Sequence, residues 1–362
     1  SLEVDAMTEQ LLLAMLDTVG CSVSNNFANF LNSGSAPEME VECLEVGDLG
    51  SGLSLLDSGD ADVLAVPASV IHGRRLEILQ AGLEIVGART PQRPYSILVS
   101  DNKLQYQPKS AIILCGQKLV RRQLRRARKG IRILDPGAYS AISGKEAPPG
   151  DPVSSVRWME ELRDSGEIDG FVTQRGIYEE AGLVSRRHSL LPDPQNAGEP
   201  RFLPLPYSDL IVLIARRMFP ASISEQISEK EGETSWWVHD NLIGSLDEDM
   251  LDKTGILVRH RQVRSLIKQA ENTRDLVLEQ VCQNPEGEVI EDEVHVEFRI
   301  EFVSKNGKKT VGLHRVVRYS DFERATIASL RDWEILLKET SRDVPKDYET
   351  DPDTPSFITL ED

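Results

Sequence analysis

The sequence is short of cysteine and has no long apolar run. Its four cysteines are scattered without paired spacing, which argues against a disulfide framework and against a zinc site. No stretch approaches the roughly 18 consecutive apolar residues of a membrane helix. Residues 210–215, an apolar run as long as any in the chain, have the length of a strand. The start also lacks the basic, apolar and cleavage regions of a secretory signal. We therefore expect a cytoplasmic protein without a membrane partner.

Catalytic signatures and positive charge are scarce as well. The six histidines show no metal-ligand spacing, and no P-loop, Gly-x-Ser-x-Gly elbow or dinucleotide fingerprint is present. The 41 Lys and Arg residues oppose 59 Asp and Glu residues, which gives a net charge of −18. We therefore expect no nucleic-acid partner, and any site for an anion has to be local.

Alternating helical and strand patterns predict an α/β protein. At about 150 residues per domain, 362 residues suggest two to three domains. The expected strands cover residues 39–46, 62–66, 83–88, 97–99, 111–114, 131–134, 170–173 and 210–214. The expected helices cover residues 10–31, 53–56, 118–129 and 154–163.

One local signature occurs twice. Gly59-Asp60-Ala61-Asp62 precedes one buried strand, and Gly166-Glu167-Ile168-Asp169 precedes another. In each, a glycine ends a helix and an acid-flanked turn starts a strand. This repeat of helix, turn and parallel strand predicts two similar α/β lobes, in which we expect Asp62 to orient the entrance of its strand.

The C-terminal third has a different pattern. After a polar, acidic linker at residues 224–234, residues 258–281 have helical spacing. Asn306-Gly307 between two alternating runs predicts a β-hairpin, and a helix over residues 322–338 would cover one face of it. Residues 343–362 hold seven acids, three prolines and one lysine, which is typical of disorder.

The expected fold class is therefore α/β, with two similar lobes of the periplasmic-binding-protein type, a small α+β third domain and an acidic disordered tail. The expected boundaries are residues 1–104 with 201–222 for lobe one, 105–200 for lobe two, 234–340 for the third domain and 341–362 for the tail.

A basic island interrupts the acidic chain. No acid lies between Asp101 and Asp135, while ten Lys and Arg residues do. The helix in this island follows a buried strand, so Arg121 and Arg122 lie near the carboxyl end of a sheet, where α/β proteins bind ligands. Guanidinium groups at a helix N-terminus suit carboxylates. We expect Arg121, Arg122 and Lys118 to bind a small carboxylate; the alternative is a solvated basic face.

The order of elements resembles the porphobilinogen deaminase family, also called hydroxymethylbilane synthase, over about residues 1–270. Glu45-Val46-Gly47-Asp48 falls at the family's Thr-Thr-Gly-Asp turn, and residues 112–132 resemble the segment with its paired substrate-binding arginines. The resemblance implies a monomeric protein of tetrapyrrole biosynthesis, and a transferase if it is active. It also implies that Arg121, Arg122, Lys118 and Ser69 bind a carboxylate-bearing pyrrole between the lobes.

The family's catalytic motifs differ here. Val70 stands at the position of the catalytic aspartate and Ser69 at that of the lysine, so Asp48 is the one acid that the spacing offers as a catalytic replacement. Cys282 resembles the cysteine that holds the dipyrromethane cofactor. The alternative function is a non-catalytic two-lobed binder or sensor of a small anionic ligand. Trp236 and Trp237 are either a stacking platform or packing residues.

Overall fold

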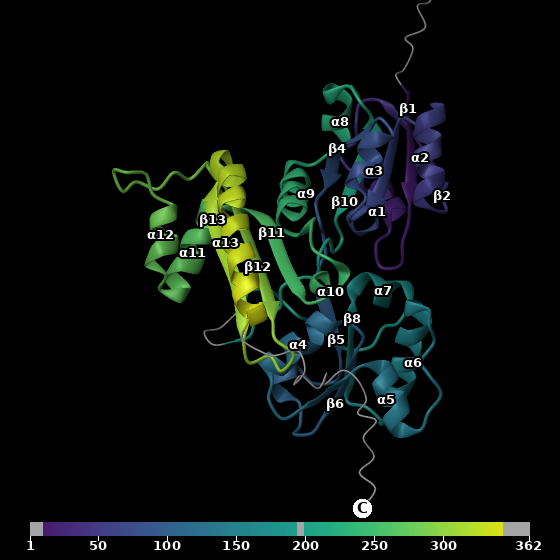
Figure 1. Ribbon diagram of the computed structural model, residues 1–362, viewed down its shortest axis with the longest axis vertical. Helices are drawn as coiled ribbons and strands as arrows, with labels where there is room; N and C mark the ends of the chain where they lie inside the picture. Colours follow the sequence, from purple (N-terminus) through teal and green to yellow (C-terminus); the bar gives the residue numbers. More distant parts are fainter. Residues whose placement is uncertain (1–9, 194–198, 343–362) are drawn as a thin grey trace, which may run out of the picture. The chain divides into compact units, whose positions relative to one another are not determined.

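The structure, a computed structural model, describes residues 10–193 and 199–342. The chain divides into two compact units: the first is Ser1–Arg93 with Tyr207–Trp237, and the second is Pro94–Pro206 with Val238–Asp362. The strands (Figure 1) are β1 (Gln10–Leu16), β2 (Glu40–Val46), β3 (Val63–Pro67), β4 (Leu83–Arg89), β5 (Ser96–Val99), β6 (Ile112–Cys115), β7 (Arg132–Leu134), β8 (Gly170–Gln174), β9 (Arg187–Ser189), β10 (Ile211–Arg216), β11 (Thr254–Gln262), β12 (Val294–Val303) and β13 (Thr310–Arg318). The helices are α1 (Val23–Leu31), α2 (Leu49–Ser58), α3 (Arg75–Gln80), α4 (Lys118–Ala127), α5 (Pro136–Ser143), α6 (Pro152–Asp164), α7 (Arg175–Glu180), α8 (Ala221–Ile227), α9 (Lys230–Ile243), α10 (Glu248–Leu251), α11 (Val263–Thr273), α12 (Leu276–Val281) and α13 (Phe322–Arg342).

The first unit is built on one five-stranded sheet in the order β2-β1-β3-β10-β4. β1 runs parallel to β2 and β3, whereas β10 is antiparallel to both of its neighbours. All five residues of β3 are buried, as expected of a strand that is covered on both faces. Helices therefore have to pack on both sides of this sheet, and Phe27 of α1 belongs to the core on one side.

The second unit contains a sheet with the same pattern, in the order β7-β6-β8-β5-β9. β6 runs parallel to β7 and β8, and β5 is antiparallel to β8 and β9. In each sheet the antiparallel strand is the first strand after the chain crosses from the other unit: β5 in the second unit and β10 in the first. The predicted fold class, α/β with two similar lobes, is confirmed. Residues 97–99, which the sequence placed in lobe one, form part of β5 in the second sheet.

The repeated signature has the same role in both lobes. The backbone N–H of Asp62 donates to Leu12 O at 2.8 Å, and its carboxylate accepts from Leu12 N at 2.9 Å. Asp169 forms the same pair with Ile112, at 2.9 and 2.8 Å. The glycine that opens each signature has a positive φ, 81° and 77°, which only glycine adopts readily. The expectation that Asp62 orients the entrance of its strand is confirmed.

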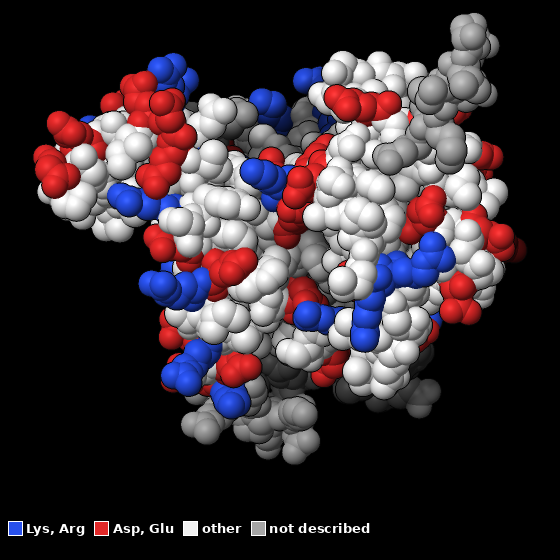
Figure 2. Space-filling model, turned by 90° about the horizontal axis from the view of Figure 1, so that it is seen from above, with Lys and Arg blue, Asp and Glu red and all other residues white. Residues whose placement is uncertain are grey.

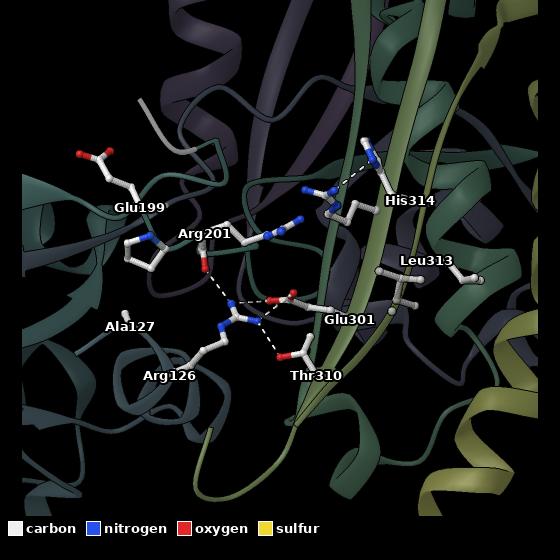
Figure 3. Close-up of a pocket in the computed structure, with 12 residues that line it drawn as sticks. Arg126, Ala127, Glu199, Arg201, Glu301, Thr310, Leu313 and His314 are labelled. Carbon is white, nitrogen blue, oxygen red and sulfur yellow. Dashed lines mark hydrogen bonds and ion pairs between the residues drawn. The ribbon is translucent and has the colours of Figure 1, made fainter. Parts of the chain in front are cut away.

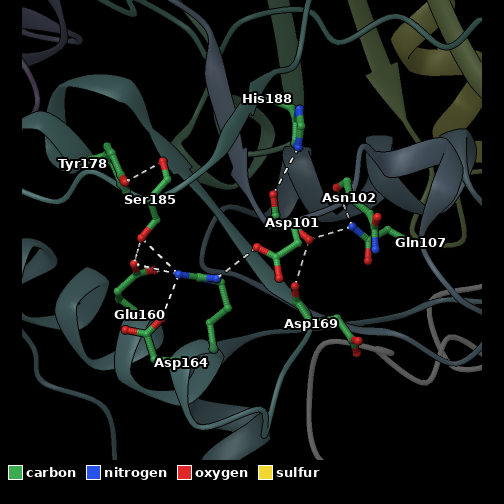
Figure 4. Close-up of polar contacts among 11 residues, drawn as sticks. Asp101, Asn102, Gln107, Glu160, Asp164, Asp169, Tyr178, Ser185 and His188 are labelled. Atoms are coloured by element: carbon green, nitrogen blue, oxygen red, sulfur yellow. Dashed lines mark hydrogen bonds and ion pairs between the residues drawn. The ribbon is translucent and has the colours of Figure 1, made fainter.

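An arginine network connects α6 to loops next to the mixed sheet β7-β6-β8-β5-β9. The Arg163 guanidinium lies 3.0 Å from the Glu160 carboxylate, 2.8 Å from Asp164 and 3.6 Å from Asp101. It also donates to Ser185 Oγ at 3.0 Å, and Ser185 in turn contacts Glu160 (Figure 4). Because Glu160 is buried, these bonds give its charge the partners that a buried carboxylate needs.

The elements predicted to form a small α+β third domain belong to the second unit. β11, β12 and β13 form an antiparallel sheet, and the turn at Gly307 joins β12 to β13 as a hairpin. Helix α13 lies along this sheet (Figure 1), as predicted for residues 322–338. Exposed acids gather around α11, α12 and the loop after them (Figure 2), and include Glu286, Glu288, Glu291 and Asp292.

Two predicted helices and one predicted linker are wrong. Residues 10–31 contain β1 before α1, and residues 258–281 begin within β11 before α11 and α12. The predicted linker at 224–234 is largely taken up by α8 and α9. The predicted disordered tail lies almost entirely outside the described residues. Within residues 10–193 and 199–342, no helix has both the length and the hydropathy that crossing a bilayer requires.

Candidate functional site

Arg121 is buried and bonded to the chain itself. Its side chain is 3% exposed, and Nη1 donates to Cys115 O at 2.8 Å and to the Asp135 carboxylate at 3.3 Å. Cys115 ends β6 and Asp135 follows β7, so Arg121 joins two neighbouring strand ends. This arrangement favours a structural role, and carboxylate binding by Arg121 stays a prediction.

Arg122 and Lys118 also have partners within the second unit. Arg122 is 3% exposed and donates to Val303 O at 2.9 Å. Lys118 Nζ lies 3.8 Å from Asp249 and 3.9 Å from Asp252, and the backbone N–H of Leu119 donates to Asp252 O at 3.1 Å. The first turn of α4, where the sequence predicted a ligand carboxylate, is thus covered by α10 and the residue after it.

The other candidates belong to different parts of the chain. Asp48 caps α2, because its carboxylate accepts from Ser51 N and Ser51 Oγ, both at 2.8 Å; these hydrogen bonds lower the pKa of Asp48. Ser69 is exposed in the turn after β3. Cys282 is 2% exposed in an apolar cluster with Leu278, and burial raises the pKa of its thiol. Catalysis by Asp48, substrate binding by Ser69 and cofactor attachment at Cys282 stay predictions.

The carboxyl ends of β1 and β3 gather three loops in the first unit. In open α/β sheets, ligands bind outside the carboxyl ends of the strands, where the strand order reverses. With the order β2-β1-β3, that point lies between β1 and β3. Since β10 is antiparallel to β3, the segment before β10 reaches the same edge. Residues 17–22, 68–72 and 207–209 therefore meet there; we call this set of loops the first-unit edge.

Three aromatic rings follow one another at the first-unit edge. His72 Nδ1 lies 2.8 Å from the Tyr207 hydroxyl, and the two ring centroids are 5.5 Å apart. The Tyr207 ring lies 6.2 Å from that of Trp236 on α9. His72 is half-buried, whereas Tyr207 is 4% exposed. The buried hydroxyl thus orients an imidazole that solvent reaches.

The loop that carries Tyr207 has an unusual backbone. Tyr207 and Asp209 have φ values of 59° and 56°, a region that bulky side chains rarely adopt. The Asp209 carboxylate holds the turn by accepting from Gln92 N at 2.8 Å and from Arg93 N at 2.9 Å. Strained backbone conformations are concentrated at functional sites, so the positive φ values of Tyr207 and Asp209 indicate that the first-unit edge is a functional site.

The thiol at this edge is not set up as a nucleophile. Burial, with the charges of Asp209 and Asp17, raises the pKa of Cys21 to about 12. The thiol therefore stays protonated at neutral pH, and a thiol attacks only as the thiolate. Among the residues described, no group of three or more His, Cys, Asp or Glu side chains is placed to hold a metal ion.

Sequence reasoning named Ser69 at this edge but missed His72 and Tyr207. The signal for Tyr207 was Pro206-Tyr207-Ser208-Asp209 directly before a strongly apolar strand, a loop that has to emerge at one end of a sheet. His72 carried no local signal, because its partner is 135 positions away.

No protein-family model matches the chain, and no curated protein matches it. Similar solved structures include an ABC transporter from Parabacteroides distasonis, with 12% identity over 64% of this chain and 73% of that chain and a TM-score of 0.32. Another is the periplasmic aliphatic sulphonate binding protein SsuA from Escherichia coli, with 14% identity over 65% and 69% and a TM-score of 0.30. A third is immunogenic lipoprotein A from Vibrio vulnificus, with 12% identity over 62% and 98% and a TM-score of 0.31.

These findings correct three expectations. The resemblance to porphobilinogen deaminase is wrong, because no family model matches and the similar structures are described as transport-related binding proteins and lipoproteins. The expected link to tetrapyrrole biosynthesis depended on that resemblance and is wrong as well. The expected cytoplasmic location is contradicted as well, since two of the similar proteins are described as a periplasmic protein and a lipoprotein.

Proposed function

We propose that the protein binds a small ligand without transforming it, and that the first-unit edge supplies the contacts. The observation that carries this proposal is the shared strand order, in which each lobe has one antiparallel strand at the same place. In such sheets the reversal point between the first and third strands is where ligands bind. The alternative that the sequence left open was a non-catalytic two-lobed binder or sensor of a small anionic ligand; the present proposal keeps the binder and differs in the charge of the ligand.

The residues at the first-unit edge suit recognition better than catalysis. His72 and Ser69 offer polar groups on one loop, and Trp236 offers an aromatic surface. Tyr207 acts through His72 as a positioning residue, because its hydroxyl bonds to the imidazole. Small-molecule sites commonly combine a few such polar groups with aromatic side chains.

The charges at this edge favour an uncharged or cationic ligand over an anion. Asp17 and Asp209 belong to the same loops, and both influence Cys21 electrostatically. The arginines expected to hold an anion, Arg121 and Arg122, are bonded within the second unit. We therefore propose a small polar ligand with a flat or apolar portion, such as an amine or an amide with an attached ring.

A thermal-shift screen with His72→Ala and Tyr207→Phe tests the proposal. Compounds that stabilise the wild-type chain are expected to lose about tenfold or more in affinity with His72→Ala, because a hydrogen-bonding group is gone. Tyr207→Phe should weaken binding less, since it removes only one hydroxyl. The matched control is Tyr106→Phe, because Tyr106 is 70% exposed and belongs to the second unit. Equal affinities in all variants would place the ligand elsewhere.

A further inference from the structure

A cavity of about 470 Å³ lies entirely within the second unit. Its wall is formed by the end of α4, residues 199–201, and parts of β12 and β13 (Figure 3). The volume falls in the range of about 300–1,000 Å³ that is typical of small-molecule sites. The function proposed above does not involve this cavity, because none of the residues that line it belongs to the first-unit edge.

One ion pair in the wall is complete. Arg126 Nη1 and Nη2 lie 3.1 and 2.9 Å from the two Glu301 oxygens, a bidentate arrangement. Arg126 Nη2 also donates to Arg201 O at 2.7 Å. The Glu301 side chain is 4% exposed, so the Arg126 guanidinium, rather than solvent, compensates its charge. Glu301 therefore fixes one side of the cavity.

Two further guanidinium groups face the cavity without such a partner. Arg299 Nη2 lies 3.0 Å from His314 Nδ1, and His314 Nε2 lies 2.8 Å from Glu297 Oε1. An arginine can only donate, so His314 accepts at Nδ1 and donates from Nε2, as a neutral imidazole does. His314 therefore does not neutralise Arg299.

The second group, Arg201, extends across the cavity (Figure 3). In the part of the chain that the structure describes, no carboxylate forms an ion pair with Arg201 or Arg299. Burial lowers the pKa of Arg299 most and the charge of Arg201 lowers it further, while the charges of Glu297, Glu301 and Asp193 act in the opposite direction without reversing the shift. Two half-buried cations that repel each other in one cavity are stabilised by an anion placed between them.

We propose that this cavity is a binding site for an oxyanion, with Arg201 and Arg299 as its two ligand-binding side chains. The ligand group is a phosphate or a group of the same shape and charge, because guanidinium forks match such oxygens. It arrives either as a free inorganic ion or as part of a small organic phosphate. The proposal does not rest on the function proposed for the first-unit edge.

The test is titration calorimetry on the full chain with four probes at one ionic strength: inorganic phosphate, inorganic sulfate, adenosine monophosphate and glucose 6-phosphate. Wild-type protein is expected to bind at least one of them, and Arg201→Gln and Arg299→Gln should each weaken that binding about tenfold or more. Arg132→Gln is the matched control, because Arg132 is an exposed arginine of the second unit. It should leave binding unchanged.

A second measurement keeps the outcome clear if Arg299→Gln folds poorly. Without an anion, Arg201→Gln should keep or raise the thermal midpoint, because it removes repulsion from Arg299. When the anion is added, the thermal midpoint should rise only for the wild type and for Arg132→Gln. Tighter binding of inorganic ions identifies a free-ion site, and tighter binding of the organic phosphates identifies a larger ligand. The proposal is overturned if no probe binds, or if all three variants lose the same amount of affinity.

Discussion

Buried arginines of the second unit lie where a single substitution has a large structural effect. Arg121 and Arg122 are each 3% exposed and donate to backbone carbonyls. A buried carbonyl that loses its donor costs about 1–3 kcal/mol. The helix α4 that carries these arginines therefore holds the second unit together, whatever the chain binds.

We expect Arg121→Ala to lower the free energy of unfolding by about 1–3 kcal/mol, because Cys115 O and Asp135 lose a common donor. Affinity for any ligand of the first-unit edge should not change. Chemical denaturation and a binding titration on the same variant measure both, with Arg132→Ala as the exposed control. A variant as stable as wild type that loses ligand would instead support the carboxylate-binding role predicted from the sequence.

Glu297 makes stability depend on acid pH. Burial alone would raise the pKa of this carboxyl, but the hydrogen bond from His314 and the charges of Arg259 and Arg261 outweigh it and hold the pKa well below its usual range. A carboxyl with a lowered folded-state pKa stabilises the fold above its unfolded-state pKa. That contribution is lost as the pH falls below the ordinary glutamate value of 4.5 towards the folded-state value.

Glu297→Gln should therefore destabilise the protein by about 3 kcal/mol or more at neutral pH, because two arginines lose a buried partner. The difference in free energy of unfolding between the wild type and the variant, which we call the gap, should narrow as the pH drops below the ordinary glutamate range. Denaturation curves at several pH values between neutral and strongly acidic conditions measure this gap. A gap that stays constant with pH would show that Glu297 has an ordinary pKa.

At the scale of elements, one glycine joins the β12–β13 hairpin to α4. Gly307 has φ +70°, which the turn requires. A Cβ at this position would also lie 2.5 Å from Arg126 N and 2.9 Å from Arg122 O. The Asn306-Gly307 pair predicted the hairpin, but its close approach to α4 became evident only in the structure.

Gly307→Ala should lower stability by more than the strain of a positive φ alone, which costs about 1–2 kcal/mol. The hairpin would have to move away from α4, and the oxyanion cavity next to it should change with it. Gly287→Ala is the matched control, since Gly287 has φ +82° and nothing within 4 Å of its added Cβ. Equal losses of thermal midpoint in both variants would mean that the close approach to α4 contributes nothing.

At the scale of the whole molecule, the lobe architecture was predictable and the residue partners were not. The paired signatures ending in Asp62 and Asp169 predicted two similar lobes, because each encodes the same local bonds. The sequence predicts a helix at the run of β1, because a strand buried on both faces is as continuously apolar as a helix core. Tyr207 contacts His72 although the two residues are 135 positions apart in the chain. No local sequence pattern specifies such a contact.

We propose that the chain binds a small molecule at the first-unit edge and returns it unchanged. Isothermal titration with the best compound from the screen, followed by mass spectrometry of the recovered compound, tests this most directly. We expect one compound bound per chain, recovered with its original mass, and binding that is weakened by His72→Ala. Recovery of a compound with an altered mass, or equal binding by His72→Ala, would contradict it.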